Sequence, residues 1–376
     1  MALKLKTTTA LGLVIAAGVI AAPGAARAMV GPQAISIDGG PLGTLSLSGG
    51  ADGYGYYMSN ATSGTKDNGM YAGSALIEVQ KTTGVLQFTV EVGSFGGSTT
   101  LGTTPSQTST SVFTTGPLFL GYVTIAPSNL PITVSAGQLG SLEGYEAGTD
   151  YSNAVQLTTD LFAVENSNSR GVSVAYAQGP LAATVQFGDG VDSGVWNTVQ
   201  GLVSYAFNAT NSLSVFGAYD LGKTGPNTYA YGGGTSAGIE PYANENMVGG
   251  YYSYTAGNLN VVPEVQYVYA KVDHSLGINK TTSNFGAALF GSYAFANTPY
   301  SIGGWVEYEN SKGAYNWFVN PNSEAIGAAI APTWQYKDLF ARANAGYLYL
   351  TRTKAYGHSG NGRGQFLGTL EAGVLF

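Results

Sequence analysis

The sequence predicts an all-β protein whose strands close into a transmembrane, antiparallel, up-and-down β-barrel of about 16 strands. Three observations support this prediction. Segments with period-two alternation recur from residue 44 onward, short and long links alternate between them, and the last twelve residues form an alternating strand that ends on Phe376. A count of about 14 or 18 stays open, because strand ends read from a sequence carry errors of a few residues. The stretch 155–164 could form another strand.

The composition suits many strands joined by tight turns. The 376 residues include 55 Gly and 26 Tyr, only 10% are charged, and none is Cys. Aromatic residues make up 12% of the chain, which argues against disorder despite the glycine content. After the N-terminus no apolar run reaches the roughly 18 residues that a helical span needs, so the sequence excludes a helical membrane protein.

The N-terminus has the form of a secretory leader. Lys4 and Lys6 precede an apolar run over 10–22, and Ala26-Arg27-Ala28 offers a small-x-small cleavage site. The run is too short for a spanning helix, which takes about 20 residues. We therefore expect a signal peptide over 1–28, an N-terminal lead-in over 29–43 and the barrel over 44–376.

The charge excludes one class of partner. The leader holds three of the 15 bases and none of the 22 acids, so the chain without it has a formal charge of −10. Phosphate binding requires a basic surface, and we therefore expect no nucleic-acid partner.

The strands follow in pairs joined by short turns, and longer Gly-, Ser- and Asn-rich links separate the pairs. Short periplasmic turns and longer outer loops are typical of outer-membrane barrels, whereas a soluble sandwich has no reason to alternate its loop lengths. An even number of strands places both chain ends on the periplasmic side. The predicted strands are 44–57, 71–80, 85–93, 117–126, 132–137, 172–177, 181–187, 199–207, 213–220, 247–255, 259–270, 285–295, 300–310, 325–336, 339–353 and 365–376.

Alternation assigns a lipid face and a lumen face to each strand. In the closing strand Phe366, Leu370, Val374 and Phe376 share an apolar face, opposite Glu371. An arginine facing lipid near mid-membrane would cost about 2–4 kcal/mol, so charged strand residues should face inward. The predicted pore wall comprises Glu78, Glu91, Glu264, Glu307, Arg342, Arg352 and Glu371. The predicted interfacial aromatic residues are Tyr267, Tyr269, Tyr308, Tyr347, Tyr349 and Phe376.

The longest link, 138–169, is the third outer loop in this arrangement, and it holds five acids and no base. Carboxylates at a constriction would favour cations, and Arg342 and Arg352 on the facing wall would set a transverse field. An acidic, solvated surface loop is the open alternative. The candidate constriction comprises Glu143, Tyr145, Glu146, Asp150, Asp160 and Glu165.

Residues in and beside this link also resemble the pattern of a known family. Gly137-Gln138, Gly144-Tyr145-Glu146, Asn153, Gly171-Val172 and Tyr176 together resemble the OmpL-like β-barrel porin family of Gram-negative outer membranes. The resemblance implies a third loop that folds into the pore. It also implies that barrel assembly machinery reads Phe366, Leu370, Val374 and Phe376 as an assembly signal. The chain departs from the family in having few basic residues for the pore wall. The resemblance implies no particular solute for this protein.

We therefore expect an outer-membrane porin that allows passive diffusion of small hydrophilic solutes with a cation bias. Its partners would be outer-membrane lipid, the assembly machinery and those solutes, and a homotrimer stays open. The alternative is a closed barrel with a structural or adhesion role, whose binding surface would be the loop 221–246.

No enzyme, metal or cofactor is expected. His274 and His358 are the two histidines of the chain, and neither has a second His or a Cys at ligand spacing. Asp273-His274-Ser275 holds the residue types of a hydrolase triad, but consecutive strand residues point to opposite faces.

Overall fold

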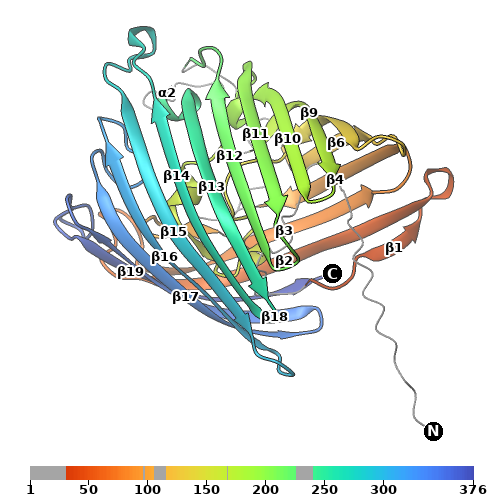
Figure 1. Cartoon of the computed structure of the whole chain (residues 1–376). Helices are drawn as coiled ribbons and strands as arrows, with labels where there is room; N and C mark the ends of the chain where they lie inside the picture. Colours follow the sequence, from red (N-terminus) through yellow and green to blue (C-terminus); the bar gives the residue numbers. More distant parts are fainter. Residues whose placement is uncertain (1–30, 96–97, 106–115, 167, 226–239) are drawn as a thin grey trace.

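A computed structural model describes residues 31–95, 98–105, 116–166, 168–225 and 240–376. Within these residues, 16 antiparallel strands form a closed barrel (Figure 1). The predicted fold class and strand number are thereby confirmed. The predicted leader, 1–28, lies outside the described residues, as does much of the loop 221–246.

The predicted strands correspond one for one to the observed strands. Most boundaries shift by one to three residues, and the strand predicted over 259–270 has the observed bounds. The barrel strands are β2 (Thr44–Met58), β3 (Asn68–Lys81), β4 (Leu86–Ser94), β6 (Leu118–Ile125), β7 (Ile132–Leu139), β9 (Ser169–Gln178), β10 (Leu181–Asp189), β11 (Trp196–Ala206), β12 (Asn211–Asp220), β13 (Glu245–Ala256), β14 (Leu259–Ala270), β15 (Thr282–Ala294), β16 (Tyr300–Lys312), β17 (Glu324–Tyr336), β18 (Leu339–Leu350) and β19 (Gly364–Leu375).

The barrel closes between its last and first strands. β19 pairs with β2 from Leu367↔Met58 to Leu375↔Gly50. The short strand β1 (Ile35–Asp38) then pairs with the start of β2, Thr44–Leu47. The predicted lead-in thus contains β1 and the turn η1 (Gly40–Leu42).

Short turns lie at one end of the described barrel and longer loops at the other, as the sequence indicated. The turns β9–β10 and β13–β14 have two residues each and begin with Gly179 and Gly257, both at φ +59°. Tight hairpins need this left-handed backbone, which glycine adopts without strain. The C-terminus lies at the short-turn end (Figure 1), where the Leu375 N–H donates to the Asp338 carbonyl at 2.7 Å.

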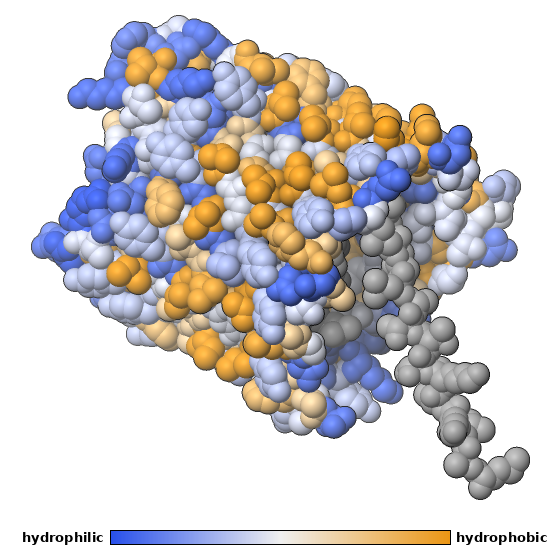
Figure 2. All heavy atoms as spheres, in the orientation of Figure 1, coloured by the Kyte–Doolittle hydropathy of each residue, from blue (hydrophilic) through white to orange (hydrophobic). Residues whose placement is uncertain are grey.

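The two faces of each strand differ as predicted for a membrane barrel. On β19, Leu370 is 72% exposed on the outside, whereas the neighbouring Glu371 is 3% exposed on the inside. Figure 2 shows hydrophobic residues gathered over the middle of the strands and hydrophilic residues toward the ends. Among the described residues, no helix has the length and apolar character that a membrane crossing requires.

The hydrophobic core lies inside the barrel. The connection 140–168 between β7 and β9 enters the lumen, and we call it the lumen loop. It contains η2 (Asp150–Ser152), β8 (Leu157–Thr158) and α1 (Asp160–Ala163). The stretch 155–164 is therefore part of the lumen loop and adds no strand to the barrel.

A segment of the preceding long connection joins the lumen loop. This segment, β5 (Thr99–Thr100), pairs with β8 in parallel. In the described parts of the long connections lie three further short helices: η3 (Gly190–Asp192), α2 (Glu240–Ala243) and η5 (His274–Leu276).

Candidate functional site

Wall side chains hold the backbone of the lumen loop across the barrel. Trp305 Nε1 on β16 donates to the Leu157 carbonyl at 2.8 Å, and Gln266 Nε2 on β14 donates to the Leu161 carbonyl at 2.7 Å. A buried carbonyl without a partner is costly, and the wall therefore stabilises the irregular backbone of the loop.

Wall oxygens complement these donors. Glu307 Oε2 accepts from the Asp160 N–H at 2.8 Å, and Asn344 Oδ1 accepts from the Gln156 N–H at 2.9 Å. Together these bonds fix the loop against strands β14, β16 and β18. The third long connection thus folds into the lumen, where the resemblance placed it.

Two acids of the candidate constriction bond to the loop itself. Glu143 accepts from the backbone N–H of Asn166 at 2.7 Å and from its side-chain amide at 2.9 Å. Glu146 accepts from the Thr159 N–H at 3.0 Å and from its hydroxyl. Burial raises the pKa of each carboxyl to about 7, although these hydrogen bonds favour the charged form.

The other loop acids lie next to acids of the wall. Burial and the nearby carboxylates of Glu309 and Glu146 raise the pKa of Asp160 well above its usual value. Burial and the neighbouring Glu264 do the same for Glu165. We call this set the acidic band: Asp160, Glu165, Glu245, Glu264, Glu307 and Glu309, each at most 7% exposed.

Tyr145 and Gly144 shape the loop between these acids. The Tyr145 ring packs against two rings of the wall. Its centroid lies 5.1 Å from that of Phe290 and 5.6 Å from that of Tyr251. Gly144 has φ +70°, and a Cβ there would lie 1.9 Å from Glu165 Oε1. Both the backbone conformation and the space therefore require glycine in this motif.

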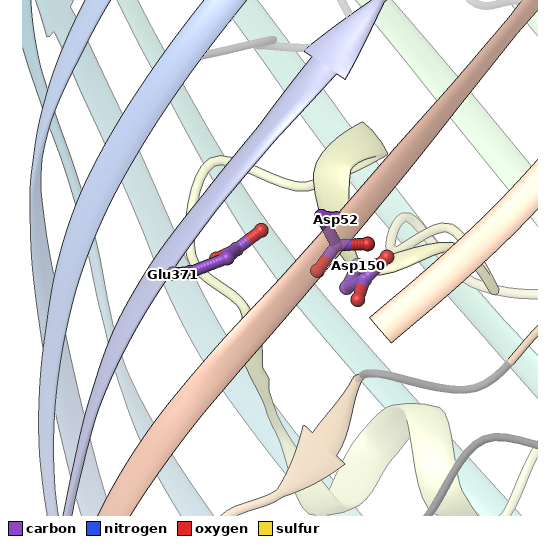
Figure 3. A group of neighbouring side chains, drawn as sticks. All are labelled: Asp52, Asp150 and Glu371. Carbon is purple, nitrogen blue, oxygen red and sulfur yellow. The ribbon is translucent and has the colours of Figure 1, made fainter. Parts of the chain in front are cut away.

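A second acidic group lies where the lumen loop meets the closure of the barrel. Asp52 on β2, Asp150 on η2 and Glu371 on β19 each offer an oxygen within 4.8 Å of the others (Figure 3). Glu371 also receives two bonds from Arg342, from Nε and from Nη2, each at 2.8 Å. Arg342 in turn donates to the Asn153 carbonyl at 2.6 Å and to the Asp150 carbonyl at 3.0 Å.

The remaining predicted wall residues make other contacts. Glu78 and Glu91 are cross-strand partners, and Ser48 Oγ donates to Glu78 Oε1 at 3.2 Å. Arg352 lies beyond the end of β18 at the long-loop end, where it forms an ion pair with Glu324. The structure therefore places Arg342, and not Arg352, against the lumen loop.

On the closing strand, the residues predicted to form the assembly signal lie largely on the outer face. Phe366 and Val374 share the parity of the exposed Leu370. Phe376 follows the end of β19, and its N–H donates to the Gly49 carbonyl at 3.0 Å.

The histidines do not form a catalytic arrangement in the described residues. His274 Nδ1 contacts Asn279 Oδ1 at 3.2 Å, whereas the Ser275 hydroxyl donates to Asp273. The imidazole thus does not lie between acid and hydroxyl, as a triad requires. His358 is exposed.

The sequence reasoning missed Asp52, Glu245 and Glu309. Asp52 has the opposite parity to the apolar Leu45 and Leu47 of its strand. Glu309 shares the parity of Glu307, so alternation alone could have found both. Glu245 falls in the predicted loop 221–246, because β13 begins two residues earlier than the alternation predicts.

The family model described as "Putative beta-barrel porin-2, OmpL-like" matches residues 44–376. No curated protein matches the chain.

Similar solved structures are barrels of comparable extent. The anion-selective porin from Comamonas acidovorans has a TM-score of 0.59 at 13% identity, covering 88% of this chain and 99% of that one. Outer-membrane expressed OmpT of Vibrio cholerae has a TM-score of 0.55 at 12% identity, covering 89% and 98%. The Salmonella typhi OmpF complex with daunomycin has a TM-score of 0.55 at 13% identity, covering 91% and 100%. At these identities the likeness shows a shared fold.

Proposed function

Because this chain belongs to the OmpL-like beta-barrel porin-2 family, we propose that it is an outer-membrane porin that passes small hydrophilic solutes with a preference for cations. The acidic band carries the proposal. Its side chains lie on the inner face of β13, β14 and β16 and on the lumen loop, at most 7% exposed. Among the described residues, Arg342 is the only buried arginine or lysine, and Glu371 neutralises it.

The physical basis is the cost of moving an ion through a narrow lumen. A cation that leaves bulk water regains part of its solvation from carboxyl oxygens, whereas an anion finds no buried base in the described part of the lumen except Arg342, which Glu371 already pairs. The raised pKa values of Glu143 and Glu146 add a pH dependence, because each carboxylate gains its charge as the pH rises through about 7.

Planar-bilayer recording tests this proposal. Under a KCl gradient the reversal potential should have the sign of a cation-selective channel, and Glu264→Gln with Glu307→Gln should shift it toward zero. Asp67→Asn, on the exposed loop between β2 and β3, should leave it unchanged. A wild-type reversal potential of zero or of the opposite sign contradicts the cation preference.

A closed barrel with a structural or adhesion role is the second candidate. The packed lumen favours it: Phe216, Tyr251, Phe290 and Trp305 point inward from four strands, and each is at most 7% exposed. These side chains share one hydrophobic cluster with Leu157 and Leu161 of the lumen loop. Folded barrels that insert into the bilayer without any conductance would support this function over the porin.

We extend the proposal to export and assembly. The leader over 1–28 would direct secretion, and the exposed apolar face of the strands would contact outer-membrane lipid. The assembly machinery would read the face of β19 that carries Leu370. Replacing Phe376 by Ser should lower the amount of folded barrel in the outer membrane of expressing cells. An unchanged amount would refute the assembly signal.

A further inference from the structure

The acidic group at the barrel closure joins three separate parts of the chain. Asp52 comes from the first barrel strand, Glu371 from the last, and Asp150 from the lumen loop. Their nearest oxygens all lie within 4.8 Å of one another. Oxygens that bind one Ca²⁺ at about 2.3–2.6 Å have this spacing, because two ligands on opposite sides of the ion lie roughly twice that distance apart.

The local charge favours a divalent cation. When ionised, the three carboxylates carry three negative charges, and Arg342 supplies one positive charge through its ion pair with Glu371 at 2.7 Å. The remaining two negative charges match one divalent ion. Carboxylates this close together in a buried place repel each other strongly unless a cation or a proton lies between them.

Unpartnered polar atoms point to the same place. Neither carboxylate oxygen of Asp52 accepts a hydrogen bond among the described residues, and both oxygens are buried. Figure 3 shows this carboxylate beside that of Asp150, with Glu371 approaching from the neighbouring strand. Such acceptors, buried without a donor, are costly to leave unpaired.

Ser74 lies beside the acidic group and carries a further oxygen, independent of the carboxylates. Its backbone N–H donates to Asp150 Oδ2 at 3.3 Å, which places the residue beside the acidic group. The residue is completely buried, and its hydroxyl has no hydrogen-bond partner in the described part of the chain. A hydroxyl and carboxylates form the hard oxygen set that Ca²⁺ and Mg²⁺ prefer.

An irregularity in the sheet creates this arrangement. The β2–β3 pairing shifts register between Ala51 and Gly53, so Gly73 and Ser74 form a bulge opposite Asp52. A Cβ at residue 73 would lie 1.9 Å from Asp52 Oδ2. Glycine thus leaves room for the carboxylate, and the bulge turns the Ser74 N–H toward the lumen loop.

We infer that Asp52, Asp150, Glu371 and Ser74 bind one hard divalent cation, with Ca²⁺ the better fit, and that this ion ties the lumen loop to the barrel wall. Ca²⁺ accepts irregular oxygen sets more readily than Mg²⁺ does. The inference does not rest on the solute preference, because a barrel that conducts no ions could still hold this cation.

Isothermal titration calorimetry with CaCl₂ tests the site. The full barrel, refolded in detergent without lipopolysaccharide and stripped with EDTA, should bind about one equivalent of Ca²⁺. Asp52→Asn should abolish this binding, and Asp67→Asn on the exposed loop should retain it. The thermal unfolding midpoint should rise with Ca²⁺ in the wild type and in Asp67→Asn only.

A milder variant keeps the test valid if Asp52→Asn does not fold. Ser74→Ala preserves every carboxylate and should weaken the affinity about tenfold without changing the stoichiometry. A wild-type protein that binds no Ca²⁺ overturns the inference and leaves a shared proton between Asp52 and Asp150. Wild-type affinity in both Asp52→Asn and Ser74→Ala overturns it as well, because the ion would then bind elsewhere.

Discussion

Arg342 on β18 and Glu371 on β19 are cross-strand partners whose side chains meet inside the barrel. Neither side chain has exposed surface, and Arg342 Nη2 lies 2.7 Å from Glu371 Oε2. The same guanidinium donates to the carbonyls of Asn153 and Asp150 in the lumen loop. One side chain thus joins two neighbouring strands to the loop.

Arg342→Met should strongly destabilise the barrel. It leaves Glu371 buried without its counterion and removes donors from two loop carbonyls, and breaking a buried pair costs about 3–5 kcal/mol. Urea unfolding in lipid vesicles measures the change. Arg352→Met removes the partly exposed ion pair with Glu324 and should cost about 0–1 kcal/mol. Similar losses for the two variants would show that the buried pair does not hold the loop.

Leu370→Arg should impair folding into lipid. Leu370 is 72% exposed on the outer face, in the middle of β19. An arginine at mid-membrane costs about 2–4 kcal/mol. Heat-modifiable electrophoresis reports the folded fraction, and Leu370→Ala should fold nearly as well as the wild type. If arginine and alanine fold equally, this face does not contact the hydrocarbon.

The cation preference should increase with pH most steeply near neutrality. Burial raises the pKa of Glu143 and of Glu146 to about 7, so both carboxyls are neutral at low pH and negative at high pH. Reversal potentials between about pH 5 and 9 measure the effect. The double variant Glu143→Gln, Glu146→Gln should flatten the profile in this window. A wild-type profile that is already flat would exclude these two acids from the conduction path.

The same carboxyls should make the fold more stable below neutrality. Their pKa is higher in the folded chain than the ordinary 4.5, so the folded state binds protons more tightly. This contribution is fully present below about pH 4.5 and is lost as the pH rises through about 7. Urea midpoints of the wild type should therefore fall over that range more than those of the double variant.

Gly144→Ala should destabilise the lumen loop by about 1–3 kcal/mol, the usual cost of a strained backbone. Gly144 has φ +70°, and its Cβ position overlaps the Glu165 carboxylate. Gly357 has φ +79° in open space, so Gly357→Ala measures the backbone strain alone. A larger loss at residue 144 would isolate the contact with Glu165, and equal losses would show that the carboxylate moves aside.

The sequence predicted the barrel and its two faces because a strand in a bilayer needs a period-two pattern that can be read locally. Leu370 and Glu371 are neighbours in the chain, and their opposite burial follows from parity. The entry of the lumen loop did not follow from any local pattern, and only the family resemblance implied it.

The acidic group at the closure could not be predicted in the same way. Asp52, Asp150 and Glu371 are far apart in the sequence, and their contact depends on the register of β19 against β2 and on the bulge in β3. For Arg352, the local pattern itself predicts the wrong position. The alternation predicts a strand that continues to residue 353, but β18 ends at Leu350, and the Arg352 side chain lies at the long-loop end.

The position of that acidic group has a consequence for biogenesis. Asp52 and Glu371 belong to the two strands whose pairing is the last to form when a barrel is made from its N-terminus to its C-terminus. Asp150 reaches these two residues only when the lumen loop lies inside the barrel. The acidic group is therefore complete only in the finished barrel, when β19 has paired with β2 and the lumen loop lies inside.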